Sequence, residues 1–399
     1  MPSVVPQAPP ERDRNVVALG WVAFFGGFAQ DMIQPILPLF YSTVLGLNKE
    51  FIGLIEGSLM TVVSLTKMGA GYLSDYLGKR KALVFVGYAL SAAARFSLGL
   101  AGSGAAVFGL RLTDGVGKGL KDAPRDALVA SSAGAGALGF AFGVQRTLDT
   151  LGSVAGPLMT FWLLRLWIDR PGKYQAIFFV AGVIAAVTLL IIGLVVRERQ
   201  AALKRPGLSL RVLRGPFGGF LAVMLLFTLG NSSDAFIILR AQDVGVEVVM
   251  IPVVYALFNL VSAAASIPAG RLSDRIGRRR VIACGWAVYA LAYLGFALAR
   301  SAWMIWVLYA FYGLFYALSE GAAKAMVAEL VSEESRGAAY GLYNAAVGVM
   351  ALPASLLAGV LWHRISPAAP FAFGAALSGL ALIALWFVPP SPVRAAPPA

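Results

Sequence analysis

The segment Gly71-Tyr-Leu-Ser-Asp-Tyr-Leu-Gly-Lys-Arg-Lys81 recurs in the second half of the chain as Gly270-Arg-Leu-Ser-Asp-Arg-Ile-Gly-Arg-Arg-Arg280. Both copies have the pattern G-x-L-S-D-x-x-G followed by three basic residues. Each copy follows a long apolar stretch, which is the second such stretch of its half. A repeat of this kind at equivalent places indicates that the chain is built from two related halves.

Three further correspondences occur in the same order in the two halves. Asp31 lies in the first apolar stretch of one half, and Asp234 lies in the first apolar stretch of the other. Asp114-Gly-Val-Gly-Lys118 corresponds to Glu320-Gly-Ala-Ala-Lys324, and Gly139-Phe-Ala-Phe-Gly143 corresponds to Gly337-Ala-Ala-Tyr-Gly341. Together with the first repeat, these matches predict an internal duplication.

The composition excludes a soluble protein. Of the 399 residues, 59% are hydrophobic and only 13% are charged, and the mean hydropathy is +0.76. A soluble domain is about 45–50% apolar and about 25% charged, so this chain has too few polar side chains to cover a water-facing surface. A single cysteine, Cys284, and a single histidine, His363, exclude a disulfide framework and histidine-rich zinc sites. We therefore expect no metal and no cofactor.

A helix that crosses a membrane needs about 20 mostly apolar residues. We predict an all-α membrane protein with twelve transmembrane helices in two six-helix halves. The long first, fifth and eleventh spans contain Gly or Pro, so these helices are expected to be tilted or bent. The predicted spans are 16–42, 51–73, 82–101, 104–125, 139–165, 175–196, 217–240, 248–269, 281–299, 302–325, 338–362 and 368–389. They divide the chain into a disordered tail (1–15), a first bundle (16–196), a linker (197–216), a second bundle (217–389) and a final tail (390–399).

Basic residues concentrate in alternate loops. With a cytoplasmic N-terminus, 20 of the 33 Lys and Arg residues fall in inside segments and 7 in outside segments. Because Lys and Arg are enriched in cytoplasmic loops, this distribution predicts a cell (inner) membrane protein with both termini in the cytoplasm. The same rule accounts for the net charge of +13, so no nucleic-acid partner is expected.

Charged side chains also occur inside the predicted spans. An ionised group at the bilayer centre costs at least about 2.5–3.5 kcal/mol, so such residues are expected to face the bundle interior. Helical spacing pairs Arg111 with Asp114, Arg146 with Asp149, and Glu320 with Lys324. Each pair serves either structural neutralisation or function, and the spacing alone leaves both open. The residues expected in a proton-coupling and substrate cavity are Asp31, Glu56, Arg95, Arg111, Asp114, Arg146, Asp149, Asp234 and Glu320.

The repeated loop matches the signature G-x-L-x-D-x-x-G-[RK]-[RK] of the major facilitator superfamily (MFS), at Gly71–Arg80 and at Gly270–Arg279. The chain therefore resembles an MFS transporter over essentially its whole length. The resemblance implies two helix bundles that enclose a central cavity and rock about it, with the substrate site near the bilayer midplane.

Three shorter elements resemble the drug/proton antiporter branch of the superfamily. Asp31-Met-Ile-Gln-Pro35-Ile-Leu-Pro38 lies in the first span, Arg111-Leu-Thr-Asp-Gly115-Val-Gly117 in the fourth, and Gly152-Ser-Val-Ala-Gly156-Pro157 in the fifth. The last element lacks the glycine pair that usually follows it, because Leu158-Met159-Thr160 occupies that place. Its two glycines are also compatible with ordinary helix packing. We expect Pro35, Gly152, Gly156 and Pro157 to bend their helices.

The repeated loop is expected to act as a conformational latch, since its glycines permit a tight reversal and its bases favour the anionic cytoplasmic leaflet. The aspartates can pair with loop cations or cap a neighbouring helix. A simple topogenic turn is the alternative, and it would explain the bases but not the paired Asp and Gly. The expected latch residues are Gly71, Asp75, Gly78, Lys79, Arg80, Gly270, Asp274, Gly277, Arg278 and Arg279.

Three functional hypotheses follow. The first is a proton-coupled exporter of small amphipathic compounds, in which Asp31 and the Arg146–Asp149 pair exchange the proton and Arg111 modulates the exchange. The second is a permease or exchanger for an organic anion or metal chelate, favoured by the interior arginines. The third, a receptor or membrane enzyme, is disfavoured because the chain has no nucleophile–base–histidine arrangement. The expected partners are a small-molecule substrate, protons and the lipid bilayer, and the protein is expected to be a monomer.

Overall fold

A computed structural model describes residues 14–133, 137–198, 212–213 and 215–389, and within these ranges the chain is helical and contains no β-strand. The N-terminal half comprises α1 (Arg14–Ile33), α2 (Leu37–Leu39), η1 (Phe40–Val44), α3 (Lys49–Leu77), α4 (Arg80–Leu98), α5 (Gly104–Ser132), α6 (Leu138–Leu166) and α7 (Lys173–Leu194). The C-terminal half comprises α8 (Pro216–Gly230), α9 (Asp234–Asp243), α10 (Ile251–Ile276), α11 (Arg278–Leu298), α12 (Ala302–Leu330), η3 (Glu333–Ser335), α13 (Arg336–Arg364) and α14 (Ala369–Leu385).

The predicted tails and most of the predicted linker lie outside the described residues. Helix α1 nevertheless begins at Arg14, so Asn15, which we placed in the disordered tail, is helical and buried. Its side-chain amide donates hydrogen bonds to Ser132 Oγ and to the carbonyl of Arg197, each at 3.0 Å. Asn15 thereby ties the start of α1 to the end of α5 and to the segment that follows α7.

Nine helical stretches within the described ranges are long and apolar enough to cross a membrane. Helices α5 and α6, each 29 residues long, are not among them, and both contain charged side chains in their middle turns. Helix α14 is apolar but has only 17 residues. The described structure therefore shows an all-helical membrane protein. That the chain has twelve transmembrane helices remains a prediction.

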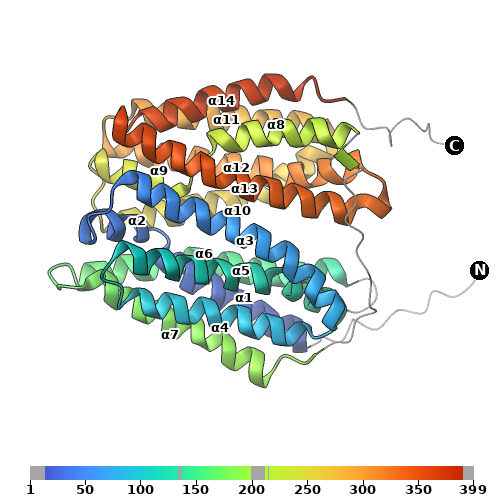
Figure 1. The fold of residues 1–399 in the computed structure, drawn as a ribbon, viewed down its shortest axis with the longest axis horizontal. Helices are drawn as coiled ribbons and strands as arrows, with labels where there is room; N and C mark the ends of the chain where they lie inside the picture. Colours follow the sequence, from blue (N-terminus) through green and yellow to red (C-terminus); the bar gives the residue numbers. More distant parts are fainter. Residues whose placement is uncertain (1–13, 134–136, 199–211, 214, 390–399) are drawn as a thin grey trace, which may run out of the picture.

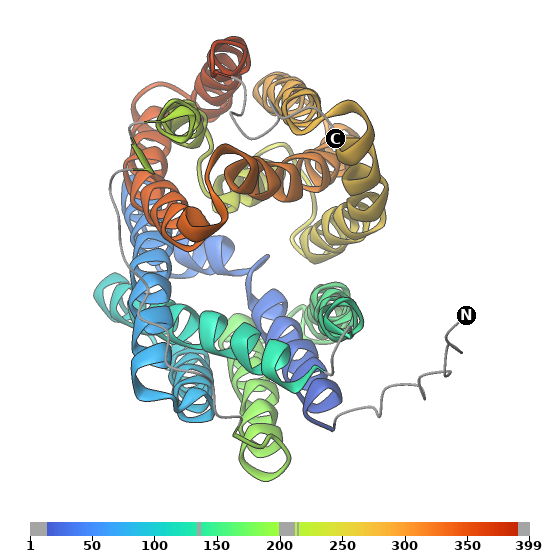
Figure 2. The same cartoon turned by 90° about the vertical axis from the view of Figure 1, so that its right-hand side faces the viewer.

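The helices form two bundles that lie side by side with their helices roughly parallel (Figure 1). Helix α1 begins and α14 ends at the same end of the molecule, which we call the terminal end; the opposite end is the far end. Viewed from the terminal end, α1–α7 form one bundle and α8–α14 form the other (Figure 2). The two bundles contact each other along α3 with α13 and along α6 with α10.

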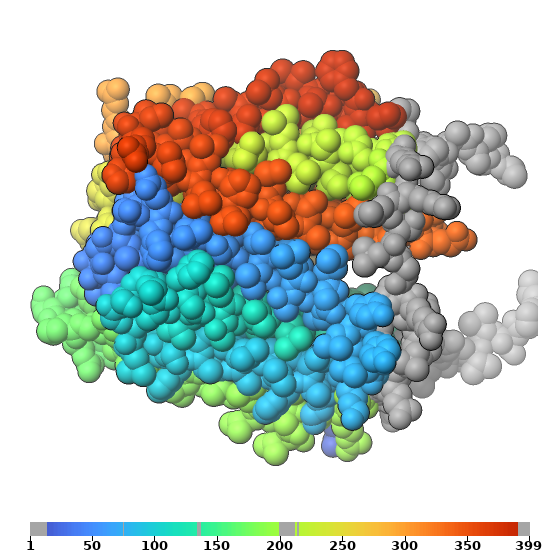
Figure 3. Space-filling view, viewed as in Figure 1, coloured from blue at the N-terminus to red at the C-terminus, as the bar shows by residue number. Residues whose placement is uncertain are grey.

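Glycines set the closest approach between the two halves. A Cβ atom at Gly53 of α3 would lie 2.2 Å from the carbonyl oxygen of Ser355 on α13, and one at Gly359 would lie 2.4 Å from the carbonyl of Lys49. Since real Cβ contacts are never this short, only glycine permits this backbone contact. Figure 3 shows the side chains of α3 and α13 packed against each other along this boundary.

The α-helix of the first predicted span (16–42) is interrupted, whereas that of the fifth (139–165) is continuous. Pro35 lies in the short segment between α1 and α2, where the α-helix stops. Pro157, by contrast, lies inside α6, which is helical without interruption. Cβ atoms at Gly152 and Gly156 would lie 2.3 Å and 2.4 Å from carbonyl oxygens of α1. These glycines bring α6 against α1, as a small-residue motif does in membranes. The bending of α6 that we expected from them stays a prediction.

The seventh predicted span, 217–240, is also interrupted, which the sequence pattern did not indicate. Helix α8 ends at Gly230 and α9 begins at Asp234, so the polar residues Asn231, Ser232 and Ser233 form the break. The hydroxyl of Tyr289 faces the carbonyl of Gly230 at 3.1 Å and Oδ1 of Asn231 at 3.2 Å. A buried side-chain donor thus replaces a missing helical one, as broken membrane helices require.

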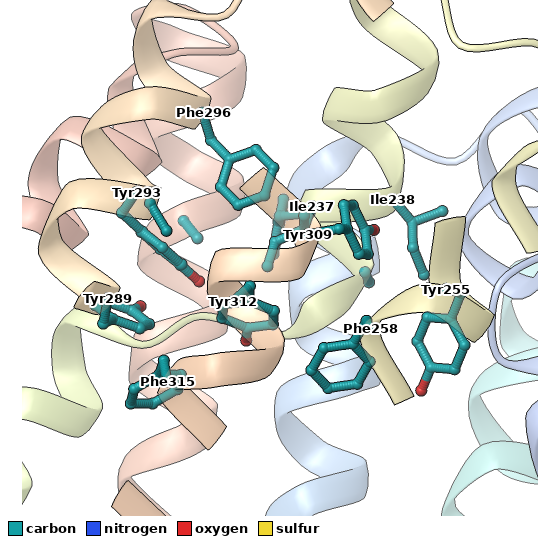
Figure 4. Packing of buried hydrophobic residues seen from close by; sticks show 14 of the residues in the cluster. Ile237, Ile238, Tyr255, Phe258, Tyr289, Tyr293, Phe296, Tyr309, Tyr312 and Phe315 are labelled. Carbon is teal, nitrogen blue, oxygen red and sulfur yellow. The ribbon is translucent and has the colours of Figure 1, made fainter. Parts of the chain in front are cut away.

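The core of the C-terminal half is aromatic. Tyr289 stacks on Tyr293 with ring centroids 4.0 Å apart, and Phe227 stacks on Trp286 at 4.6 Å. Tyr312 and Phe315 of α12 complete the contact with α11 (Figure 4). The corresponding interior of the N-terminal half contains charged side chains, so the two halves differ in their interior chemistry.

An Arg240→Lys variant should lower the free energy of unfolding by about 1.5–3 kcal/mol, a typical value for hydrogen bonds from a charged donor. The Arg240 guanidinium of α9 donates to the carbonyls of Phe296, Ala297 and Ala299, where α11 ends. A lysine keeps the charge but lacks the planar fork that reaches several acceptors. Thermal unfolding in detergent measures the loss. Arg364→Lys, at an exposed position, serves as the control, and an equal change in both variants would contradict the assignment.

Candidate functional site

Two polar cavities lie at the interface between the halves. The first has a volume of about 320 Å³ and lies between α6 and α10. The second has a volume of about 260 Å³ and is bounded by α10 and α12. Arg146 and Ser266 line both, so the cavities adjoin. The polar side chains of their walls are Arg146, Thr147, Asp149, Thr150, Ser153, Asn259, Ser262, Ser266, Tyr316, Glu320 and Lys324.

Each half contributes one ion pair to the cavity walls. Arg146 Nη1 lies 3.7 Å from Asp149 Oδ2 on α6, and Lys324 Nζ lies 2.7 Å from Glu320 Oε1 on α12. Both pairs were predicted from helical spacing, and both stay within their own helix. The Arg146 side chain is 71% exposed and that of Asp149 is 35% exposed, so this arginine is accessible to a solute in the cavity.

The cavities lie toward the terminal end, while the far end is closed. Helix α6 runs from the terminal end to the far end, and α10 runs in the opposite direction, so Arg146 and Ile267 lie nearer the terminal end than Ser153 and Asn259. At the far end, Glu50 of α3 contacts Arg364 of α13 at 3.6 Å, beside the glycine contacts described above. The described structure therefore has its interface cavities toward the terminal end and a close contact of α3 with α13 toward the far end.

A cluster of five charged side chains lies inside the N-terminal half. Arg111 Nη2 donates to both carboxylate oxygens of Glu56, at 3.0 and 3.1 Å, and Arg111 Nη1 lies 3.4 Å from Asp114 Oδ2. Asp114 is also 3.1 Å from Lys118 Nζ and 3.6 Å from Arg95 Nη2. The cluster joins α3, α4 and α5, and its arginines and acids are almost completely inaccessible to solvent.

The two remaining candidate acids lie beside the interrupted helices. Asp31 is near the end of α1, only 6% exposed, and no cation lies within 4 Å of its carboxylate among the described residues. Asp234 is the first residue of α9 and accepts a 2.6 Å hydrogen bond from the Tyr312 hydroxyl. These two acids thus lack the ion-pair partners that Glu56, Asp114, Asp149 and Glu320 have.

The predicted site residues consequently separate into three groups. Arg146, Asp149 and Glu320 are in the cavity walls. Glu56, Arg95, Arg111 and Asp114 form the buried cluster, and Asp31 and Asp234 lie at the interrupted helices; none of these six lines either described cavity. Sequence reasoning did not single out the small hydroxyl residues of the walls, since serine and threonine are also ordinary packing residues in membrane helices. Within the described ranges, no group of His, Cys, Asp or Glu is arranged to hold a metal ion.

The repeated loops reverse the chain through one glycine each. Gly78 (φ +64°) follows α3, and Gly277 (φ +95°) follows α10. Positive φ is a conformation that glycine adopts without strain. We expected Gly71 to contribute to the reversal, but Gly71 and its counterpart Gly270 lie inside α3 and α10.

The charged partners of the two loops differ. Arg278 pairs with Asp274 on its own loop and with Glu329 on α12, 3.3 Å away. In the other loop, the backbone N–H groups of Arg80 and Lys81 donate to the carboxylate of Glu198, which follows α7. An acid at this helix N-terminus is favourable, and the sequence pattern did not identify Glu198. The side chain of Asp75 lies outside the described part of the structure.

The comparisons with known proteins agree with this architecture. The profile of the Major Facilitator Superfamily matches residues 19–239 and 217–399. An uncharacterized MFS-type transporter of Methanocaldococcus jannaschii is 36% identical over 388 residues, which cover 95% of this chain and 96% of the relative. The chain belongs to the Major Facilitator Superfamily and is a membrane transporter.

Two other matches are informative at a coarser level. The crystal structure of the nucleoside transporter NupG (D323A mutant) superimposes with a TM-score of 0.80, over 94% of this chain and 99% of that chain, at 13% identity. This likeness shows the fold alone. The class E tetracycline resistance protein of Escherichia coli is 34% identical over 140 residues, which are 34% of this chain and 33% of that protein.

Proposed function

We propose that the protein exports small amphipathic compounds in exchange for protons, by alternating access between its two halves. The observation that supports this proposal is the polar cavity between the halves, which lies toward the terminal end while glycine contacts seal the far end. The partial similarity to a tetracycline resistance protein favours export of such compounds. The positive-inside distribution assigns the terminal end to the cytoplasm of a cell inner membrane.

Asp31 is the best candidate for the proton-carrying group. A buried carboxylate with no cation within 4 Å is costly, so Asp31 is suited to bind a proton. The positive charges of Lys118 and Arg95, and a hydrogen bond with Ser153, favour its ionised form. Asp149 lies on the adjoining face of α6, since a Cβ at Gly27 of α1 would be 3.0 Å from its Oδ1. Movement of α6 against α1 would change the field at Asp31, which couples proton release to the change of access.

An Asp31→Asn variant should reduce flux driven by a pH gradient at least about tenfold, since one lost general proton-transfer group typically costs this much or more. The measurement follows tetracycline and a lipophilic cationic dye in proteoliposomes, with and without an imposed pH gradient. Glu333→Gln, at an exposed position, is the matched control. Undiminished gradient-driven flux in Asp31→Asn would contradict the proton-carrying role.

A second candidate substrate class is an organic anion or metal chelate. The Arg146 side chain, which lines the cavity, is 71% exposed and that of its partner Asp149 is 35% exposed. A guanidinium suits a carboxylate or phosphate. A thermal-shift screen of the purified protein against cationic drugs, organic anions and metal chelates distinguishes the two classes, because ligands stabilise the folded state they bind. Stabilisation by anions alone would select the second class.

A further inference from the structure

The deep end of the cavity contains a hydrogen bond that joins the two halves. Asn259 Nδ2 of α10 donates to the carbonyl oxygen of Ser153 on α6, at 2.7 Å. Both residues line the larger cavity, and both lie deeper in it than Arg146 and Ile267. The contact therefore lies where the opened part of the interface meets the closed part, with α6 and α10 facing each other (Figure 2).

The acceptor of this hydrogen bond has no donor within its own helix. In an α-helix, the carbonyl of residue i accepts from the N–H of residue i+4. For Ser153 that residue is Pro157, which has no N–H. A backbone carbonyl without a hydrogen bond is costly inside a membrane, so the Ser153 carbonyl is expected to accept a hydrogen bond from another part of the protein. Asn259 of the opposite half supplies it.

We propose that Pro157 and Asn259 act as a pair, in which the proline exposes the Ser153 carbonyl and the asparagine binds it, to stabilise the state with the far end closed. The inference rests on the proposed alternation of access. Pro157 then serves to make a backbone acceptor available to the other half. Asn259 is a positioning residue, since it acts on the equilibrium between two states through the contact of α6 with α10.

A related contact in the other interface provides an internal comparison. Thr61 Oγ1 of α3 donates to the carbonyl of Gly348 on α13, at 2.8 Å. Because of the duplication, α3 and α13 correspond to α10 and α6, so both interfaces contain a side chain bound to a backbone carbonyl. The carbonyl of Gly348, however, retains its helical donor, since residue 352 is leucine. The two contacts should therefore respond differently to a change at Pro157.

The test is a double-mutant cycle read out as a population of states. Spin labels are placed on the full-length protein at positions 140 and 272, exposed sites near the terminal ends of α6 and α10, with Cys284→Ser. Distance distributions then report the ratio of terminal-end-open to terminal-end-closed molecules. Asn259→Leu, which keeps the side-chain size but removes the donor, should lower this ratio about three- to tenfold, the range for one hydrogen bond between membrane helices.

Pro157→Ala supplies the decisive comparison. An N–H at position 157 gives the Ser153 carbonyl a helical donor in every state, which lowers the cost of losing the bond from Asn259. Asn259→Leu introduced into Pro157→Ala should therefore change the ratio less than it does with Pro157 in place. The effect of Thr61→Val should be the same with either residue at position 157. If Asn259→Leu does not fold, Asn259→Ala is measured in its place, and folding of each variant is checked by its elution volume.

The outcomes separate this proposal from the proposed function. Two populations whose ratio Asn259→Leu leaves unchanged, or changes equally with and without Pro157, would overturn the pairing of Pro157 with Asn259 alone. A single distance distribution in every variant, at every pH, would contradict alternating access itself.

Discussion

An Arg111→Met variant should lose about 3–5 kcal/mol of unfolding free energy, the typical cost of removing one partner from a buried ion pair. The Arg111 side chain is fully buried and bonds both oxygens of Glu56. Methionine fills a similar volume but leaves the Glu56 carboxylate, itself 1% exposed, with only the Tyr41 hydroxyl at 3.4 Å. Thermal or denaturant-induced unfolding of the purified protein in detergent measures the loss.

Two comparisons make this prediction specific. The double variant Arg111→Met with Glu56→Gln removes both charges and should be more stable than either single variant, because no unpaired carboxylate remains. Arg146→Met removes an arginine with the same i,i+3 aspartate spacing but an exposed side chain, so its stability should change by less than about 1 kcal/mol. Equal losses for Arg111→Met and Arg146→Met would contradict the structural role of the buried cluster.

A Gly53→Ala variant should shift the protein toward states with the far end opened, by about 5- to 150-fold. The added Cβ would lie 2.2 Å from a backbone carbonyl of α13, and backbone cannot turn aside as a flexible side chain can. Overpacking of this kind costs about 1–3 kcal/mol. Spin labels at positions 100 and 298, exposed and near the far ends of α4 and α11, report the separation.

Gly69→Ala is the matched control for Gly53→Ala. Gly69 lies on the same helix, α3, and a Cβ there would meet nothing within 4 Å. Both substitutions raise helix propensity by the same amount, so only the clash with α13 differs. If Gly53→Ala leaves the far-end distance unchanged, or Gly69→Ala shifts it equally, the far end is not closed by this glycine contact.

Hydrophobic length and the internal repeat were sufficient to predict the general architecture. The apolar stretches predicted helices, which the structure shows, and the two G-x-L-S-D-x-x-G loops predicted the Major Facilitator Superfamily, which the family match shows. The duplication of the chain stays a prediction. The interruption after Gly230 escaped prediction, because the carbonyl of Gly230 and the side chain of Asn231 at the break are bound by the buried Tyr289 hydroxyl. That contact joins residues distant in sequence, and a local pattern does not show it.

The pairings within single helices were predictable, and the distribution of charges between buried and open regions was not. Helical spacing alone predicted the ion pairs Arg111–Asp114 and Arg146–Asp149, which have the same i,i+3 spacing. The structure buries the first pair and leaves the second in the cavity wall. Glu56 on α3 binds Arg111, whereas no acid on another helix lies within 4 Å of Arg146 among the described residues. The burial of a charged pair depends on the neighbouring helices, which spacing within one helix does not reveal.

The most direct test of alternating access is the accessibility of the cavity from the two faces of the membrane. In the Cys284→Ser background, Ser262→Cys places one thiol in the wall of the larger cavity. A membrane-impermeant maleimide is applied to either face of sealed vesicles, under pH gradients of both directions. The account predicts labelling from the face of the terminal end under one gradient and from the opposite face under the other. Labelling from one face only, under every condition, would contradict it.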